Sequence, residues 1–318
     1  MKITHLLLLP MLITAGAAMA QAYPARPVIF VSPFPPGGGN DLISRTIAIP
    51  MARGLGQNVI VENRPGAETA VGMHTVARSA PDGYTVILSS STFAINATLN
   101  PTLPYTQKDF DPVSLIGSTP YILTVSAASP LKSVNDLMAQ ARARPGGVFA
   151  GSSSLASRLA IELLNFQTDT KITHVPYKGA AMAVTDLMSS RIGVMFGTPP
   201  TVLNHIKAGK LRGIAVTSAK RFSTQPDLPT VSEALKLPGF EASTWYGVLA
   251  PARTPTVILR RLSSEIMKAV EDPAARDMLL TQGIDVAGNS PEQFKAYIAS
   301  ETEKWARVIK FAGVKPEE

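Results

Sequence analysis

Short apolar runs typical of strands recur along the chain, and stretches with the apolar spacing of helices lie between them. This alternation of strand and helix predicts parallel sheets wrapped by helices. The sequence therefore belongs to the α/β class of folds. The predicted strands cover residues 27–33, 59–61, 85–88, 121–125, 147–150, 172–175, 194–196 and 213–217.

Capping residues and prolines mark where the helices between these strands should begin and end. Ser133 and Asp136 have the spacing of a capping box, and both Thr254-Pro255 and Ser290-Pro291 place a capping residue before a proline. Pro50 should kink or end a helix that begins at Leu42. The C-terminal helices are expected to return and cover the first part of the fold. The other predicted helices span 71–78 and 155–166 and end at 189 and at 208.

The pattern starts again in the second third of the chain, which predicts two α/β units. Links near 117–124 and 241–250 are expected to join them. The first lobe would then contain residues 21–120 and 246–318, and the second lobe residues 121–245. The chain is large for one core and long enough for two.

The first twenty residues have the features of a signal peptide. Lys2 precedes an apolar stretch, and Ala18-Met19-Ala20 fits a small-residue cleavage pattern, with Ala20-Gln21-Ala22 as a second candidate. The alternative is a membrane anchor, but the stretch is short for a span and is interrupted by Pro10 and Thr14. We expect a soluble monomer in the periplasm.

Composition narrows the possible functions. The formal charge of +7 comes from scattered Lys and Arg residues without interleaved aromatics, which argues against nucleic-acid binding and favours a weak attraction for anions. The chain has no cysteine, so it cannot carry a lipoprotein anchor, a disulfide or a cysteine-ligated metal. No His residue is spaced from another as metal ligands are, and no cofactor is predicted.

The loops that follow the predicted strands share one composition. Five of them, at 34–41, 89–92, 151–154, 176–179 and 197–200, are rich in Gly, Pro, Ser and Thr. Such loops present backbone N–H groups at helix N-termini, where a carboxylate or phosphate binds without a charged side chain. In open sheets ligands lie at this end of the strands. The candidate ligand-binding residues are Phe34, Pro35, Pro36, Gly37, Gly38, Gly39, Asn40, Asp41, Ser90, Ser91, Thr92, Gly151, Ser152, Ser153, Ser154, Tyr177, Lys178, Thr198 and Pro199.

Several of these candidates have a purely structural alternative. Asp41 has the position of a helix N-cap, Tyr177 could belong to the core, and Lys178 could be a solvated surface charge. Enzyme signatures are missing: the chain has no G-x-S-x-G elbow, phosphate loop or H-E-x-x-H motif. We therefore expect a binding protein and not an enzyme.

A series of motifs along nearly the whole mature chain resembles the Bug (TctC-like) family, the extracytoplasmic solute receptors of tripartite tricarboxylate transporters. Each motif alone is weak, and their number, order and spacing carry the resemblance. They are Tyr23-Pro24 with Arg26-Pro27, Pro33 to Gly38 with Asp41, Val61 to Ala67, Ala80 to Thr85, Asp109-Phe110, Pro112 to Gly117, His174 to Gly179, Leu211-Arg212, Ala215 to Thr217, and Pro226 to Val231.

The resemblance implies a type II periplasmic-binding fold, with two doubly wound lobes joined by two crossing segments and closing on the ligand. It implies that a small carboxylate, such as a di- or tricarboxylate, an acidic amino acid or an aromatic acid, is held by the loops at 35–41 and 89–92. The partner implied is the membrane part of a tripartite transporter; the alternative is a membrane sensor kinase.

The sequence departs from the family pattern at the second-lobe loop. The segment from Gly151 to Arg158 is one residue shorter than the family's S-S-G-x-G-S-x-x-H, and Arg158 takes the place of the histidine. Asn40 after the glycines and Glu68 after Ala67 are further departures. These changes concern the class of ligand more than the fold.

Overall fold

The computed structural model describes residues 23–37 and 39–315. The predicted signal peptide at 1–20, its cleavage site and the candidate Gly38 lie outside the described residues. Within them, no helix has both the length and the apolar character that a membrane crossing requires.

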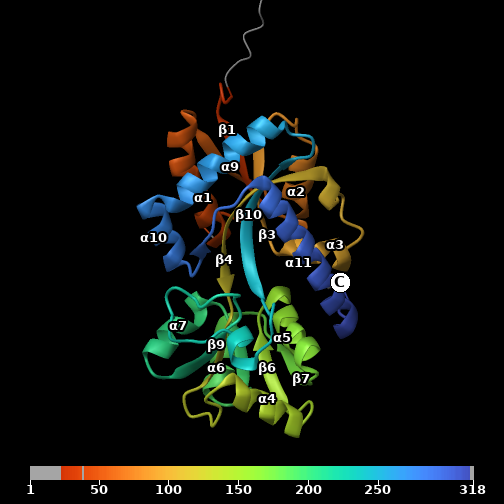
Figure 1. The fold of residues 1–318 in the computed structure, drawn as a ribbon, viewed down its shortest axis with the longest axis vertical. Helices are drawn as coiled ribbons and strands as arrows, with labels where there is room; N and C mark the ends of the chain where they lie inside the picture. Colours follow the sequence, from red (N-terminus) through yellow and green to blue (C-terminus); the bar gives the residue numbers. More distant parts are fainter. Residues whose placement is uncertain (1–22, 38, 316–318) are drawn as a thin grey trace, which may run out of the picture.

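Two sheets form the centres of two units, one above the other in Figure 1. The first sheet has the strand order β11-β4-β10-β3-β1-β2, and the second has the order β7-β6-β8-β5-β9. We call the two units, each a sheet with its covering helices, the first lobe and the second lobe. The first sheet contains β1 (Val28–Ser32), β2 (Val59–Asn63), β3 (Thr85–Ser90), β4 (Phe110–Pro120), β10 (Ser243–Pro251) and β11 (Asp285–Val286); the second contains β5 (Ile122–Ser126), β6 (Val148–Ser152), β7 (Ile172–Pro176), β8 (Val194–Gly197) and β9 (Leu211–Val216).

Each sheet is mixed and not purely parallel. In the first sheet β1 lies parallel to β2 and β3, whereas β10 runs antiparallel to both β3 and β4. In the second sheet β6 lies parallel to β7 and β8, and β5 runs antiparallel to β8 and β9. The prediction of parallel sheets therefore holds for the βαβ parts, and the strands that connect the lobes add the antiparallel pairs.

Helices cover both faces of the first sheet. On one face α9 (Thr256–Glu271) packs against α1 (Gly39–Leu55), and on the other α11 (Pro291–Ala312) packs against α3 (Thr92–Leu99) and β4. The return of the C-terminal helices to the first lobe confirms that prediction. The first lobe also contains α2 (Ala70–Ala77), α10 (Pro273–Thr281) and the 3-10 turns Ala67–Thr69 and Gln107–Asp109; the second contains α4 (Val134–Ala143), α5 (Leu155–Thr168), α6 (Ala180–Met188), α7 (Pro199–Lys207) and α8 (Val231–Leu235).

The lobes are joined where two long strands cross between them. β4 passes through Tyr121 directly into β5, and the chain returns to the first sheet through β10, which pairs with β4 from Ser243 opposite Pro120. Thr217 lies between the two crossings and is fully buried. Its hydroxyl accepts a hydrogen bond from the Tyr121 amide (2.8 Å) and donates one to the Ala242 carbonyl (2.7 Å). A third bridge is the far end of α11, where Phe311 packs on Phe166 of α5 with ring centroids 5.1 Å apart.

Several helix boundaries confirm the sequence-based predictions and others correct them. Ser133 and Ser290 cap α4 and α11 as predicted. The prediction for Thr254 is wrong by one residue, because Pro255 is the N-cap of α9. Pro50 does not end its helix, since α1 continues to Leu55.

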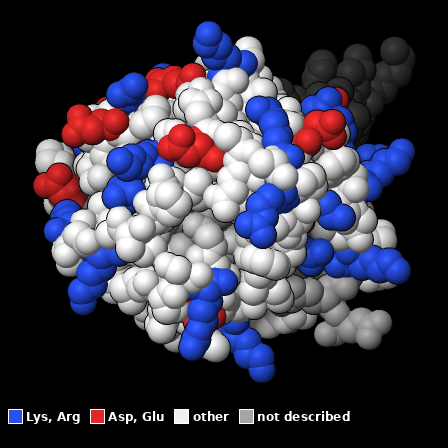
Figure 2. Space-filling model, turned by 90° about the horizontal axis from the view of Figure 1, so that it is seen from below, with Lys and Arg blue, Asp and Glu red and all other residues white. Residues whose placement is uncertain are grey.

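Charge is distributed unevenly over the molecule. Figure 2 looks onto the end of the second lobe, where Lys and Arg side chains are spread over most of the face. Residues 121–242, between β4 and β10, contain 13 Lys and Arg against seven Asp and Glu, a net charge of +6. The remaining residues from 21 onward contain 16 of each kind. The positive charge of residues 21–318 is thus carried by the second lobe.

Candidate functional site

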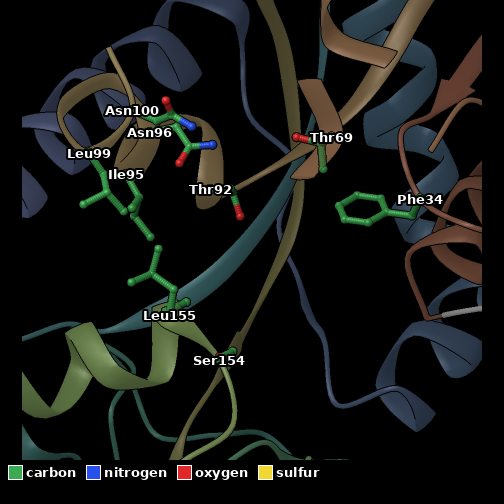
Figure 3. Close-up of a pocket in the computed structure, with 10 residues that line it drawn as sticks. Phe34, Thr69, Thr92, Ile95, Asn96, Leu99, Asn100, Ser154 and Leu155 are labelled. Atoms are coloured by element: carbon green, nitrogen blue, oxygen red, sulfur yellow. The ribbon is translucent and has the colours of Figure 1, made fainter. Parts of the chain in front are cut away.

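A cavity of about 310 Å³ lies where the two lobes face each other. Its walls are largely apolar, with Phe34, Ile95 and Leu99 from the first lobe and Leu155 from the second (Figure 3). Polar groups are set among them: hydroxyls of Thr69, Thr92 and Ser154 and amides of Asn96 and Asn100. Pockets of this size and mixture are typical of small-molecule sites.

One wall of this cavity is α3, which the sequence analysis missed. Ser89 and Ser90 belong to strand β3, and Thr92 opens the helix, so the predicted loop at 89–92 shrinks to Ser91. The Ser91 amide donates to the Trp245 carbonyl of β10. The Asn96 side chain is buried, and its Nδ2 has no hydrogen-bond partner among the described residues. A buried amide without a partner in a cavity wall is a candidate contact for a bound molecule.

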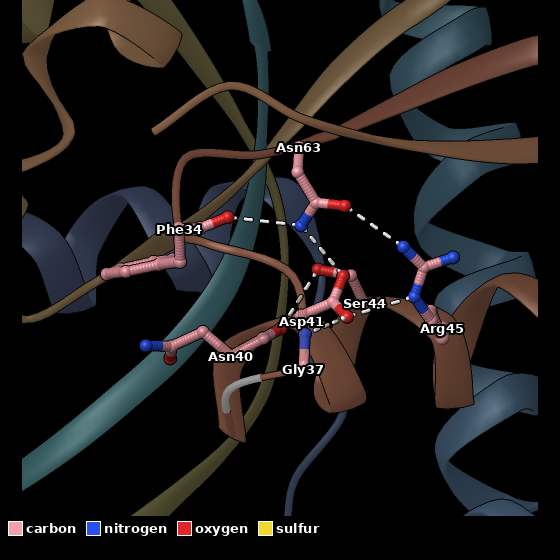
Figure 4. Close-up of polar contacts among 7 residues, drawn as sticks. All are labelled: Phe34, Gly37, Asn40, Asp41, Ser44, Arg45 and Asn63. Carbon is pink, nitrogen blue, oxygen red and sulfur yellow. Dashed lines mark hydrogen bonds and ion pairs between the residues drawn. The ribbon is translucent and has the colours of Figure 1, made fainter. Parts of the chain in front are cut away.

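The loop from Phe34 to Asp41 is held by a network centred on the Asp41 carboxylate (Figure 4). One oxygen accepts hydrogen bonds from the Gly37 amide (2.9 Å) and Arg45 Nε (3.0 Å), and the other accepts one from Asn63 Nδ2 (2.8 Å). Asn63 Nδ2 also donates to the Phe34 carbonyl. Asp41 is therefore a brace for the loop.

The surroundings of Asp41 keep its carboxyl ionised. Burial alone would raise its pKa, but the hydrogen bonds from Arg45, the Gly37 amide and Asn63 together lower the pKa below its ordinary value. Since α1 begins at Gly39, Asp41 lies in the first helical turn and is not the N-cap residue. Its oxygens are engaged by the protein.

On the second lobe, the N-terminus of α5 faces the central cavity. Ser154 caps this helix, with its hydroxyl accepting from the Ser157 amide in a capping box. The N-terminal turn of a helix carries a partial positive charge, which favours anions. Ser154 and Leu155 also line a second cavity of about 470 Å³, together with Arg158, His174, Tyr177 and Lys178.

His174 is neutral in this second cavity at neutral pH. Burial and then the nearby charge of Arg158 lower its pKa from 6.5 to about 4. One ring nitrogen, Nε2, lies 2.6 Å from the Ser152 hydroxyl. The Tyr177 hydroxyl is directed elsewhere, donating to Asp186 at 2.9 Å.

A third and smaller cavity, of about 160 Å³, lies between the start of α1 and the start of α7. Gly39, Asn40 and Thr119 face Thr198 across it. Asn40 Oδ1 and Thr119 Oγ1 are buried without hydrogen-bond partners among the described residues. At this second place where the lobes approach each other, the unpaired polar groups belong to the first lobe.

The three cavities gather about half of the residues predicted from the sequence. Pro35, Pro36, Gly37, Asp41, Ser91, Gly151 and Pro199 do not line any of them, and Ser90 lines only a narrow crevice beside Phe34. Most of the other lining residues lie on helices and strands, which carry no Gly- or Ser-rich signal in the sequence. The predicted residues that line the three cavities are Phe34, Gly39, Asn40, Thr92, Ser152, Ser153, Ser154, Tyr177, Lys178 and Thr198; the missed ones include Thr69, Ile95, Asn96, Leu99, Asn100, Thr119, Leu155, Arg158, His174 and Tyr246.

A metal centre finds no support in this part of the molecule. Across residues 23–37 and 39–315, no group of three or more His, Cys, Asp and Glu side chains is arranged to hold a metal ion. The cleft groups are hydroxyls, amides, one neutral imidazole and two cations. These groups suit hydrogen bonding to an anion.

Comparison with known proteins gives one consistent result. A family model described as tripartite tricarboxylate transporter family receptor matches residues 43–314. Protein BugT of Bordetella pertussis is 38% identical over 310 residues, which cover 95% of each chain.

Solved structures show the same likeness. The R. palustris protein Rpa4515, solved with adipate, is 34% identical, has a TM-score of 0.73 and is matched over 93% of this chain and all of its own. A TctC solute binding protein from Polaromonas, solved without ligand, is 30% identical with a TM-score of 0.82, over 91% of this chain and 99% of its own. The fold is that of periplasmic binding proteins.

Proposed function

The chain belongs to the tripartite tricarboxylate transporter receptor family, and from this premise we propose that it captures a small organic carboxylate between its two lobes. Members of the family and its structural neighbours are periplasmic substrate-binding receptors, so the chain is a receptor and not an enzyme. We propose in addition the class of its ligand and the delivery of the bound ligand to a membrane transporter.

The central cavity is the observation that carries the proposal. It combines apolar walls, which suit a hydrocarbon body, with hydroxyls, amides and a helix N-terminus, which suit an acid group. The likeness to a protein solved with adipate, an acid with a hydrocarbon body, supports the same pairing.

We expect one carboxylate of the ligand to bind the first lobe at the loop that follows β1 and at the start of α3. The brace at Asp41 fixes this loop before the ligand arrives, which lowers the entropy lost on binding. Thr92 and Asn96 would add side-chain hydrogen bonds from α3, and Ser154 would add one from the second lobe when the lobes close.

The proposed cycle needs a protein that opens and closes, with the lobes divided at residues 120 and 246 as the sequence suggests. A closed, loaded receptor would then dock on the membrane subunits of a tripartite transporter. We propose that it does so as a monomer in the periplasm, after removal of the signal peptide near Ala20.

A thermal-shift screen against a panel of carboxylic acids tests the proposal. An acid present at about 100 times its dissociation constant should add about 2.7 kcal/mol to the free energy of unfolding. The panel should include straight-chain and aromatic acids, with sugars and amines as matched neutral and cationic controls. Stabilisation by a sugar or an amine, and by no acid, would refute the proposed ligand class.

Uptake measurements test delivery. A strain that lacks this receptor should lose uptake of the acid found in the screen, and a strain that lacks the membrane subunits should lose it equally. Uptake that is unchanged in the receptor-deficient strain would instead favour a receptor that signals to a sensor kinase.

A further inference from the structure

Arg158 stands apart from the other arginines that the structure describes. Three of them are half-buried: Arg158, Arg212 and Arg261. Arg212 donates to backbone carbonyls, and Arg261 forms an ion pair with Glu265 at 2.8 Å. Arg158 alone of the three has no side-chain hydrogen bond or ion pair with any described residue.

The guanidinium of Arg158 also has a buried hydrogen-bond donor without an acceptor. Its Nε is shielded from solvent and makes no hydrogen bond among the described residues. Glu162, one turn further along α5, forms no ion pair with Arg158, and its carboxylate accepts from Asn165 at 3.4 Å. The charge of Arg158 lowers the pKa of Glu162, but burial has the larger effect and raises it. A partly buried charge without a partner is costly unless something else neutralises it.

Among the described residues, no acidic side chain lines the cavity around Arg158. Its polar lining consists of Ser152 to Ser154, neutral His174 and the exposed cation Lys178. Tyr177 is already bonded to Asp186, outside the lining. The cavity therefore has a net positive charge with donors around it, and it suits an anionic group.

This cavity adjoins the central one. Ser154 and Leu155 line both, so a ligand held at the first-lobe loops and lying along the apolar central cavity would extend toward Arg158. We propose that Arg158 binds a second anionic group of the ligand, and that the receptor selects acids with two anionic ends and an apolar spacer. The inference rests on the proposed function and names the ligand more narrowly.

Matched pairs of acids test this inference on the mature protein. Isothermal titration should compare straight-chain mono- and dicarboxylates of four to eight carbons, such as hexanoate with hexanedioate. A charge-assisted hydrogen bond to Arg158 should make the preferred dicarboxylate bind about tenfold to a hundredfold more tightly than its monocarboxylate partner.

Three variants test whether Arg158 causes the preference for dicarboxylates over monocarboxylates. Arg158→Gln should bring the ratio of the two affinities close to one while leaving the monocarboxylate affinity unchanged. Arg158→Lys should retain part of the ratio, because it keeps the charge and loses the planar fork. Arg144→Gln removes an equal charge from an exposed site of the same lobe outside the cavity and should change neither affinity.

The outcomes separate the inference from the proposed function. If the wild-type protein binds monocarboxylates as tightly as dicarboxylates, or if Arg158→Gln keeps the ratio and Lys178→Gln abolishes it, the inference fails and the receptor for carboxylates stands. If no acid of the series binds the wild-type protein, the proposed function fails with it. The melting temperature of each variant shows that it folds, and removal of an unpaired charge should not lower it.

Discussion

Asp41 shows how far a single residue can be interpreted from the sequence. Its position after three glycines predicts either a helix cap or a ligand contact, and the structure gives it a third role as a brace. Asn63 and Arg45 complete that brace. Asn63 lies at the end of β2, beside the end of β1 at Ser32, so strand pairing brings it to the loop. Spacing along the chain contains no information on that pairing.

His174 gives a prediction for the effect of pH. Since the folded protein lowers its pKa from 6.5 to about 4, the unfolded chain binds more protons between these two values. This contribution to the free energy of unfolding is therefore constant above about pH 6.5 and falls as the pH is lowered toward 4. NMR titration of the imidazole in the ligand-free protein should give the lowered pKa directly.

Comparison with His174→Gln isolates that contribution from other titrating groups. Burial raises the pKa of Glu162 and of Glu241, and these carboxyls act in the opposite direction within an overlapping range of pH. The difference between the two proteins should therefore shrink as the pH falls from about 6.5 to 4. An imidazole that titrates near 6.5 in the folded protein would contradict the prediction.

At the scale of elements, hydrophobic periodicity predicts the segments in which strands and helices alternate. It does not predict the elements outside this alternation. The βαβ parts have apolar runs followed by amphipathic helices, and their boundaries lie within a few residues of the predicted ones. Helix α3 was missed because it is buried on several sides, so its apolar residues show no helical period. The sequence predicts only a link where β10 lies, because the antiparallel pairing of β10 with β3 and β4 depends on partners more than 120 residues away.

The buried hydroxyl of Thr217 fastens the two crossing segments to each other. Thr217→Val keeps the shape of the side chain but removes the hydroxyl that accepts a hydrogen bond from the Tyr121 amide. We expect a loss of about 1–3 kcal/mol in the free energy of unfolding, measured by urea denaturation. Thr217→Ser should restore most of it.

A surface threonine provides the control for that substitution. The Thr185 hydroxyl donates to the Ala181 carbonyl within α6 and is exposed, so Thr185→Val should change stability by about 0.5 kcal/mol or less. Equal losses at both positions would show that the hydroxyl of Thr217 has no special role in joining the segments.

At the scale of the whole molecule, the uneven charge favours anionic ligands before any contact is made. The net charge of +6 lies on the second lobe, on which Lys and Arg side chains are spread over the outer face (Figure 2). Arg158 and Lys178 of this lobe line the second cavity. A positive field on one wall of a cleft raises the rate at which anions arrive. The sequence indicated the sign of this field, and the fold was needed to assign it to one lobe.

Stopped-flow measurements of the association rate at different ionic strengths should detect the effect of this positive field on an anionic ligand. Raising the ionic strength from about 0.01 M to 0.15 M shortens the Debye length from about 30 Å to 8 Å, so the association rate of a dianionic acid should fall severalfold. Replacing the exposed Lys132, Lys207 and Lys210 by Gln should weaken this dependence and leave the dissociation rate unchanged, because none of them lines the three cavities. An association rate that does not depend on salt would contradict this view.

The pairing of Pro120 with Ser243 has a consequence for how such receptors can diversify. The chain leaves the first sheet and rejoins it at two neighbouring positions, so residues 121–242 form a cassette inserted between two paired strands. Exchanging this cassette with that of a relative would leave all six strands of the first sheet with their partners. Recombination at these two points would then give new combinations of the two cleft walls, with the first-lobe wall kept and the second-lobe wall replaced.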